Sequence, residues 1–429
     1  MSDIRRFTKW LSAGSAALLM LDAGCSVEPA QVLENPTPSD HFAFEVVPSC
    51  VDMVAATRAL GLSILADNAT ETIVTSPAST VIALSMLGSG ATGDAEAEFA
   101  AVLGVGGQTR DEAANALLGT LKPFSADLDE IDLEDLPSDP QIHLANQMVL
   151  NEGFTPEAEY SESLQKWFGV VIATMDLSSA SGKKYLDAWV RANTAGLIEE
   201  SAIEPSSGLR LVVQNAVLLV SQWQEPFDAG SSGPADFTLP TGEVVNTEFM
   251  SSRRLARYAE MDRWQMVELP YGSEGQLVAL YVSPREGVEP TDLTPAKLSD
   301  LESLMTGDDV VVEVPIVDLA SSLDLIPSLE SLGLTSIFSW NPPALGYISE
   351  SGDLMVSLIN QQGRIQIDEA GTAAAAVTEI AVTEGAAAEE PTPPKYFIAD
   401  RPHLVLITDT LTGWDFFQIL VNDPRGDED

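Results

Sequence analysis

The stretch from Ile365 to Pro402 constrains the fold of this chain more than any other. It begins with strand-forming residues, passes Gly371, continues as a run of small residues and ends in an acidic, proline-rich segment. Within residues 372–382 every second side chain is uncharged and most of these are small, which is the period-two pattern of a strand with one face on a core. The glycine and the proline-rich exit are equally typical of an exposed loop. Both interpretations hold if the segment is a loop at one time and a central strand at another.

The composition limits the number of domains and the classes of binding partner. With 429 residues, 45% of them hydrophobic and 20% charged, the chain is long enough for one large domain or two ordinary ones. The formal net charge is -44 and there are only 21 Lys and Arg. Nucleic acids and heparin-like polyanions are therefore poor partners, because phosphate and sulfate groups are bound by clustered basic side chains.

Residues 1–25 are predicted to be an export signal. A positively charged start is followed by the apolar stretch 10–21, which is too short to span a bilayer. Residues 26–45 contain three prolines and scattered acidic residues, and we expect them to be a flexible linker.

The export segment ends in a sequence that resembles the cleavage box of bacterial lipoproteins, in which Cys25 would be acylated. Asp22 stands where that box has an aliphatic residue, so a poorly processed segment is the alternative. The other cysteine, Cys50, is unpaired if Cys25 is acylated or removed; a disulfide between the two would only tie the linker to the first helix. Neither arrangement gives a disulfide framework or a metal site.

The start of the small-residue run resembles the hinge of the reactive-centre loop in serpins. In the inhibitory members of that family an acidic residue, a glycine, a threonine and an alanine run mark the hinge. The matching residues here are Glu369, Gly371, Thr372, Ala373, Ala374, Ala375 and Ala376. The alternative interpretation of this segment by itself is an alanine-rich linker, so the rest of the chain decides.

Further serpin-like motifs follow in the family's order over about residues 45–425. The segment from Asn215 to Phe227 resembles the pattern Asn-Ala…Trp-x-x-Pro-Phe, and the segment from Arg401 to Pro424 resembles the last hairpin, with His403 in place of the usual Phe. The resemblance implies an α+β fold with a large central mixed sheet A, smaller sheets B and C, about eight to nine helices and an exposed reactive-centre loop. It places a serpin domain at residues 46–425 and the hinge and loop at residues 369–400.

The resemblance also assigns two regions that control opening of the central sheet, the shutter and the breach. Their residues here are Ser76, Ser79, Asn215 and Gln361 in the shutter and Trp223 in the breach. Gln361 replaces the family's usual His, and we expect its amide to keep a hydrogen bond to the region of Asn215. Ile316 replaces the Lys that usually pairs with Glu369, so we expect the breach to open more easily.

Two segments carry expectations from their pattern alone. Residues 49–67 show apolar side chains at helical spacing, with Val51, Val54, Ala55, Leu60 and Ile64 expected to face inward. The acidic, proline-containing part of residues 107–140 is predicted to be a solvated surface insertion.

No pattern of enzyme chemistry stands out. The three histidines, His41, His143 and His403, are not singled out as partners of a nucleophile, and a Ser/His/Asp relay requires such a partner. There is no glycine-rich phosphate loop and no Cys/His metal spacing. We therefore expect a chain that is not an enzyme and that has no cofactor and no metal.

The resemblance implies an inhibitor of serine endopeptidases, with cysteine endopeptidases as a second class, that is cleaved in its loop and inserts the hinge as a strand. The scissile bond is expected at residues 383–390, which contain no Lys, Arg or large aromatic residue, so an elastase- or subtilisin-like target fits best and a glutamyl-specific one is second. The alternative is a non-inhibitory serpin that acts as a binding or carrier protein. We expect an exported monomer, lipid-anchored in the cell envelope or extracellular. The candidate scissile residues are Glu384, Gly385, Ala386 and Ala387.

Overall fold

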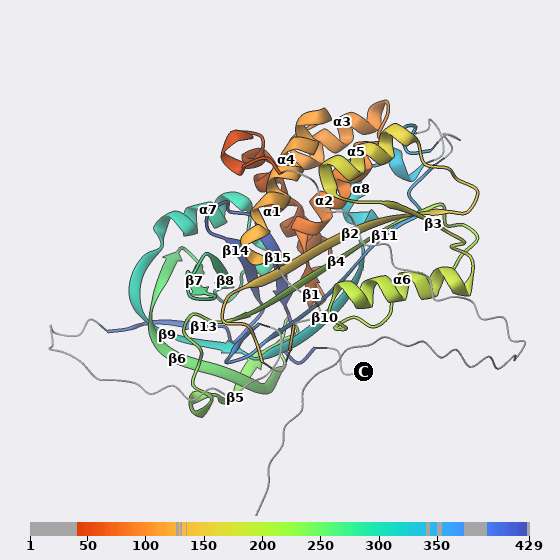
Figure 1. The fold of residues 1–429 in the computed structure, drawn as a ribbon. Coiled ribbons are helices and arrows are strands. Elements are labelled where there is room, and N and C mark those ends of the chain that lie inside the picture. The colour runs from red at the N-terminus through yellow and green to blue at the C-terminus, as the bar shows by residue number, and fades with distance from the viewer. Residues whose placement is uncertain are drawn as a thin grey trace, which may run out of the picture. The chain divides into compact units, whose positions relative to one another are not determined.

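The computed structural model describes residues 41–125, 128, 131–133, 135–339, 344–349, 354–372 and 393–426. The α-helices in this part of the chain are α1 (Cys50–Asp67), α2 (Pro77–Gly88), α3 (Asp94–Leu103), α4 (Gly107–Thr120), α5 (Ala158–Phe168), α6 (Ala180–Asn193), α7 (Pro295–Leu304) and α8 (Ile326–Ser331). Five short 3-10 helices accompany them: η1 (Phe44–Val46), η2 (Lys122–Phe124), η3 (Ala229–Ser231), η4 (Pro290–Asp292) and η5 (Ser336–Phe338). Most of the helices, but not α6 and α7, gather on one side of a central sheet (Figure 1).

The strands form two sheets. They are β1 (Ile73–Thr75), β2 (Gln141–Asn151), β3 (Ile172–Met175), β4 (Leu211–Gln222), β5 (Gly233–Thr238), β6 (Val244–Met261), β7 (Trp264–Pro270), β8 (Leu277–Pro284), β9 (Thr306–Pro315), β10 (Val317–Asp324), β11 (Leu358–Ile367), β12 (Gly371–Thr372), β13 (Lys395–Ile398), β14 (His403–Asp409) and β15 (Asp415–Val421).

The central sheet, sheet A, has six described strands in the order β10-β11-β12-β4-β2-β3. It is mixed, because β4 runs antiparallel to β2 and parallel to β11. Helix α2 packs on one face of β2 and β4, and α6 lies on the other face (Figure 1). Burial on both faces explains why β4 is a nearly continuous apolar run rather than an alternating one.

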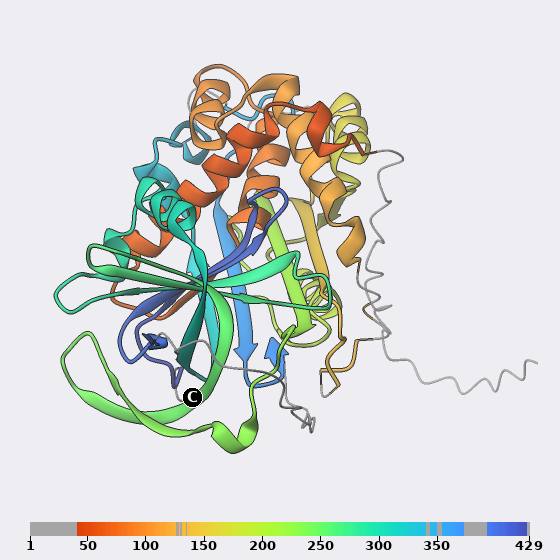
Figure 2. The same cartoon turned by 90° about the vertical axis from the view of Figure 1, so that its left-hand side faces the viewer.

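The other sheet has the strand order β1-β15-β14-β8-β7-β6-β9-β13, with β5 added on β6. The long green strands and the dark-blue strands in Figure 2 belong to this sheet. The sequence predicted two smaller sheets, B and C, and the structure joins them through β6. This strand is 18 residues long, so its first part pairs with β5, its middle with β9 and its last part with β7. One strand therefore belongs to both predicted sheets.

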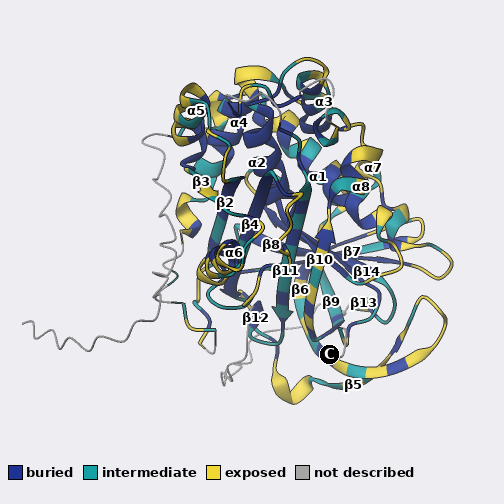
Figure 3. Cartoon of the chain, turned by 90° about the vertical axis from the view of Figure 1, so that its right-hand side faces the viewer, coloured by how far each residue is buried: buried dark blue, intermediate teal, exposed yellow. Residues whose placement is uncertain are grey.

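Helix α2 lies at the centre of the fold, and all 12 of its residues are buried (Figure 3). Pro77 opens the helix without losing a hydrogen bond, and the hydroxyl of Ser76 accepts a bond from the backbone N–H of Ser79 at 3.3 Å. The helix has no polar face, which is typical of a helix enclosed by other elements.

Helix α1 is rotated from the orientation that the apolar pattern predicted. Val51 is 63% exposed and Ala55 is also exposed, whereas Leu60 and Ile64 face inward as expected. The buried face includes Cys50, Met53, Thr57 and Gly61. The prediction for Val51 and Ala55 was wrong because the inward face carries a hydroxyl and a glycine, which a count of apolar residues ignores. Thr57 is accommodated because its hydroxyl donates to its own helix, to Met53 O at 2.8 Å.

The acidic insertion is not fully solvated. Among its described residues Leu136 is only 3% exposed and packs with Leu218 and Val220 of β4, while Ile131 and Leu133 are partly buried in the same cluster. The aliphatic residues recur every two or three positions among the acids, so one side of the segment can cover the sheet. The prediction of a solvated insertion is therefore wrong for these residues.

His403 is buried where the family usually has Phe. It is 1% exposed, stacks on Tyr281 with ring centroids 6.1 Å apart, and meets the edge of Phe237. Its Nδ1 lies 2.9 Å from the carbonyl oxygen of Arg401, and its Nε2 has no hydrogen-bond partner among the described residues. Burial lowers the pKa of His403 to about 4.

This pKa predicts a loss of stability in acid. The unfolded chain binds the proton near pH 6.5, so the stability present above that pH is lost as the pH falls toward 4. His403→Phe keeps the aromatic packing and should reduce the loss of unfolding free energy between pH 7 and pH 4.5 by about 2–3 kcal/mol. Urea unfolding at the two pH values measures this, with His41→Phe as the control. An unchanged pH dependence in His403→Phe would contradict the assignment.

Candidate functional site

The hinge begins inside sheet A. Strand β11 ends in a turn whose Asp368 carboxylate accepts hydrogen bonds from the N–H groups of Ala370 and Gly371, at 2.9 and 3.2 Å. Burial raises the pKa of Asp368, and these two bonds oppose the rise. The chain then enters β12, which Figure 3 labels. In β12, Gly371 pairs with Gln222 and Thr372 with Ser221 of β4. Gly371 and Thr372, the first residue of the small-residue run, thus already form a short strand between β11 and β4.

Close approach of β4 explains the glycine in the hinge. A Cβ atom on Gly371 would lie 2.0 Å from Ser221 O and 2.7 Å from the Cα of Gln222. Both atoms belong to the backbone, so no side chain can move aside. Only glycine lets β12 come this close to β4 at this position.

Thr372 is anchored by an aromatic pair. It is 1% exposed, and its hydroxyl oxygen lies 2.6 Å from the phenol oxygen of Tyr271. Tyr271 stacks on Trp223 with ring centroids 4.3 Å apart and an angle of 13° between the planes. Burial raises the pKa of Tyr271 well above its ordinary value, so the phenol stays neutral and available for hydrogen bonding.

The predicted breach residue, Trp223, contacts the hinge directly. Its backbone N–H donates to Ala370 O at 2.9 Å and its indole N–H donates to Asp368 O at 2.8 Å. The N–H of Phe227 donates to Glu369 O at 2.8 Å. Three consecutive hinge carbonyls are therefore held by two aromatic residues that follow β4.

Glu369 forms no ion pair with any residue that the structure describes. Ile316, which replaces the Lys expected as its partner, packs partly buried against the hydrophobic core. The hinge is held by backbone hydrogen bonds and aromatic packing instead of this ion pair.

The shutter is built differently from the expectation. The Gln361 amide oxygen accepts from the hydroxyl of Thr75 at 2.6 Å and the N–H of Ser76 at 3.0 Å, while its NH2 group donates to Ser76 O at 2.9 Å and to the hydroxyl of Thr80 at 3.0 Å. Asn215 is the backbone neighbour of Gln361, but its buried side-chain oxygen has no partner among the described residues. Among the described residues the Gln361 amide therefore makes no hydrogen bond to the region of Asn215, contrary to the expectation, because the end of β1 and the start of α2 satisfy the whole amide.

Sheet A thus has a closed and an opened end. At the closed end β4 and β11 pair directly, from Val212–Leu358 to Asn215–Gln361. Beyond this point the two strands are separated at their far ends by β12. The shutter residue Gln361 marks the last direct pair.

The structure brings together Glu369, Gly371, Thr372 and Trp223 at the breach, and Ser76, Ser79 and Gln361 at the shutter. The contributions of Tyr271, Asp368 and Gln222 were not predicted, since these residues carry no charge pattern or motif that marks a partner of the hinge. Other predicted site residues lie outside the described residues, namely Cys25, Ala373, Ala374, Ala375, Ala376, Glu384, Gly385, Ala386 and Ala387.

Two properties of the described residues concern membranes and metals. None of their helices combines the length and apolar character that crossing a bilayer requires. No group of three or more His, Cys, Asp or Glu side chains among them is placed to hold a metal ion. Cys50 is a free, buried thiol whose pKa burial raises to about 11, and it donates a weak bond to Ala113 O at 3.7 Å.

The family model described as "Serpin (serine protease inhibitor)" matches residues 57–424, and this chain belongs to the serpin family. Members of that family are in general protease inhibitors rather than enzymes, and some, such as thyroxine-binding globulin, are non-inhibitory.

Relatives and solved structures agree with this assignment. The chain is 26% identical to Serpin-Z7 of Hordeum vulgare over 363 residues, covering 81% of this chain and 88% of that protein. It is 27% identical to Iripin-8 of Ixodes ricinus over 378 residues, covering 85% and 92%. Its fold is similar to the thermophilic serpin tengpin in the native state, with a TM-score of 0.78, 21% identity and coverage of 91% and 97%. It is also similar to thyroxine-binding globulin in complex with thyroxine, with a TM-score of 0.71, 20% identity and coverage of 88% and 99%.

Proposed function

We propose that this protein inhibits serine endopeptidases as a suicide substrate, with cysteine endopeptidases as a second class. The protease cleaves the loop between β12 and β13, and the segment that starts at Thr372 then inserts between β4 and β11. The observation that carries the proposal is β12 itself, whose two residues already lie between these strands.

Insertion exchanges one set of hydrogen bonds for a larger one. The direct pairing of β4 with β11, four residues on each strand, must open. The new strand would then pair with β4 on one side and β11 on the other. About ten new hydrogen bonds at ~1 kcal/mol each, together with side-chain burial, provide the driving force that distorts an attached protease. Loop insertion of this kind is known for serpins as a switch that releases stored strain.

The small side chains of the hinge favour rapid insertion. Residues 373–376 are all alanine, and no proline or charge lies among residues 372–378. A proline would remove a hydrogen-bond donor from the new ladder, and a charge on the buried face would be costly. Fast insertion matters because the acyl-enzyme otherwise hydrolyses and the protease escapes.

The loop sequence supports an elastase- or subtilisin-like target that accepts Ala, Val or Thr, with a glutamyl-specific protease that reads Glu384 second. We also propose that residues 1–25 export the protein, that Cys25 carries a lipid anchor, and that the inhibitor is a monomer at the cell envelope or outside the cell. Mass analysis of the N-terminus of the mature protein tests the lipid anchor. A mature chain that begins with a residue without a lipid modification would exclude the anchor.

Incubation with subtilisin or elastase tests the proposal. We expect a band on a denaturing gel at the summed mass of protease and inhibitor, and a large rise in the melting temperature of the loop-cleaved protein. Cleavage without this band and without the rise would instead indicate a non-inhibitory serpin that serves as a binding or carrier protein.

A further inference from the structure

Residues 135–140, which we call the clamp, join the end of β4 to the turn that follows Tyr271. The backbone N–H of Gln222 donates to Pro137 O at 2.9 Å, and its side-chain amide donates to Leu136 O at 2.7 Å. Gln222 is also the residue that pairs with Gly371 of the hinge. One residue of β4 therefore connects the clamp on one side with the hinge on the other.

The other end of the clamp is fixed on the turn. The carboxylate of Asp139 accepts from the hydroxyl of Ser273 at 2.7 Å and from its N–H at 3.1 Å, and these bonds lower the pKa of Asp139. A Cβ atom on Gly272 would lie 2.4 Å from Cδ of the Pro140 ring, so the turn packs tightly against Pro140. The N–H of Gly272 donates to Gln222 O at 3.0 Å, which closes the connection.

The clamp also reaches the hinge through apolar packing. Leu136 forms a cluster with Leu218 and Val220, and Ala370 packs against this cluster partly buried. Ala370 immediately precedes β12, and its carbonyl accepts from the N–H of Trp223. The residue that leads into the strand is thus held on both its side chain and its backbone.

We infer that the clamp seats the hinge in sheet A before any protease acts, so that insertion begins from a strand already in register. The start of a strand is its most costly step, because several backbone dihedrals are fixed before the ladder stabilises them. Residues from 373 onward can extend β12 along β4 without moving Gly371 or Thr372. The clamp therefore removes the first step of insertion without opposing the later ones; its role in inhibition rests on the proposed function.

Two variants weaken the clamp and leave the rest of the fold in place. Leu136→Ser weakens the apolar cluster, and Gln222→Ala removes only the side-chain bond to Leu136 O while the backbone pairing of Gln222 remains. Leu411→Ser is the matched control, because Leu411 is 76% exposed in a turn between β14 and β15. Circular dichroism and melting temperature verify that each variant is folded.

Hydrogen exchange of the intact full-length protein, without protease, measures how firmly the hinge is held in sheet A. In both clamp variants we expect the peptide that covers residues 365–372 to exchange at least tenfold faster than in the wild type, with no change in Leu411→Ser. Wild-type protection in both Leu136→Ser and Gln222→Ala would overturn the inference. This measurement is independent of inhibition, so it decides the clamp even if the wild type forms no complex with a protease.

Reaction with subtilisin or elastase measures the effect of the clamp on the stoichiometry of inhibition. We expect the clamp variants to need several times more inhibitor molecules per protease inactivated, because more acyl-enzyme hydrolyses before insertion. Faster exchange with an unchanged stoichiometry would overturn the role of the clamp in insertion. If the wild type is only cleaved, the proposed function fails and the exchange result still stands.

Discussion

Replacing Thr372 by arginine is expected to convert the inhibitor into a substrate that the protease cleaves without being trapped. Thr372 is fully enclosed between β11 and β4, with its hydroxyl on Tyr271. A guanidinium at this position would face the stacked pair of Tyr271 and Trp223, in the buried space that the Thr372 side chain occupies. A buried charge without a partner costs several kcal/mol, which is enough to expel β12 from the sheet and stall insertion at its first residue.

The measurement is the fraction of inhibitor that ends in an SDS-resistant complex against the fraction that is merely cleaved. Thr372→Ser is the matched control, because it keeps the hydroxyl for Tyr271 and removes only a methyl group. We expect the complex to disappear in Thr372→Arg and to persist in Thr372→Ser. A Thr372→Arg variant with unchanged stoichiometry would show that insertion does not proceed through this position.

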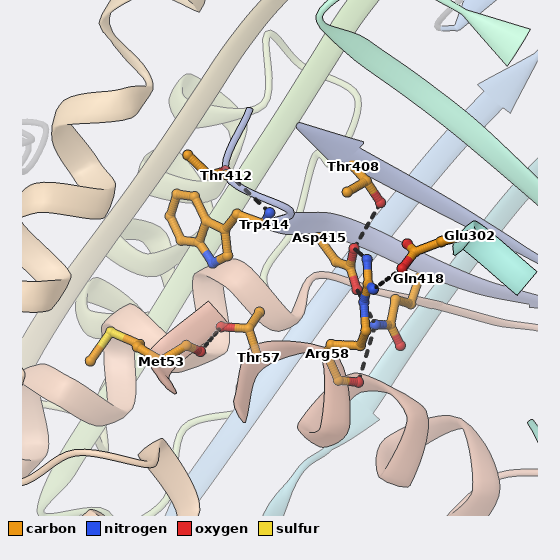
Figure 4. A network of polar contacts seen from close by, with 9 residues as sticks. All are labelled: Met53, Thr57, Arg58, Glu302, Thr408, Thr412, Trp414, Asp415 and Gln418. Carbon is orange, nitrogen blue, oxygen red and sulfur yellow. Dashed lines mark hydrogen bonds and ion pairs between the residues drawn. The ribbon is translucent and has the colours of Figure 1, made fainter. Parts of the chain in front are cut away.

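Replacing Arg58 by methionine is expected to cause a large loss of stability. Figure 4 shows Arg58 of α1 in a polar network with Asp415 of β15 and Glu302 of α7. The guanidinium makes two hydrogen bonds of 3.0 Å to the fully buried Asp415, which also accepts from Thr408 at 2.7 Å and Gln418 at 2.9 Å. The network joins two helices to the last hairpin of the chain.

Methionine fills much of the space of Arg58 but leaves Asp415 buried without a countercharge. Removing one partner of a buried ion pair typically costs about 3–5 kcal/mol of unfolding free energy. The control is Arg253→Met at the exposed pair Arg253–Asp309, where we expect little or no loss of stability because solvent screens the two charges. Urea unfolding followed by tryptophan fluorescence compares the two, and equal losses would contradict the role of the buried network.

Local patterns predicted several features that the structure contains. The glycine and small residues after β11 indicated a segment able to act as a strand, and Gly371 and Thr372 do so. The apolar spacing in residues 49–67 indicated a helix with Leu60 and Ile64 on its inward face, and both are buried in α1. These predictions succeed because the period of a strand or a helix depends on residues only a few positions apart.

Other features depend on contacts between distant segments. The partners of Gln361 lie more than 280 residues away in the chain, so its hydrogen bonds to the start of α2 have no local signal. The same holds for Leu136, which lies in an acidic segment and is buried because β4 and Ala370 offer it an apolar surface. The composition of that segment indicated that it is solvated, but in the structure its aliphatic side chains pack against the sheet.

The sequence by itself determined that this chain is a serpin with a hinge of small residues, because both features depend only on residue types and short spacings along the chain. Only the tertiary structure decided how the hinge is held. Gly371 is needed because β4 leaves no room for a Cβ atom, and the clamp is held because Gln222, at the end of the neighbouring strand β4, binds it. The physical reason is that close approach, burial and hydrogen-bond satisfaction are properties of pairs of segments, which come into existence only when the chain has folded.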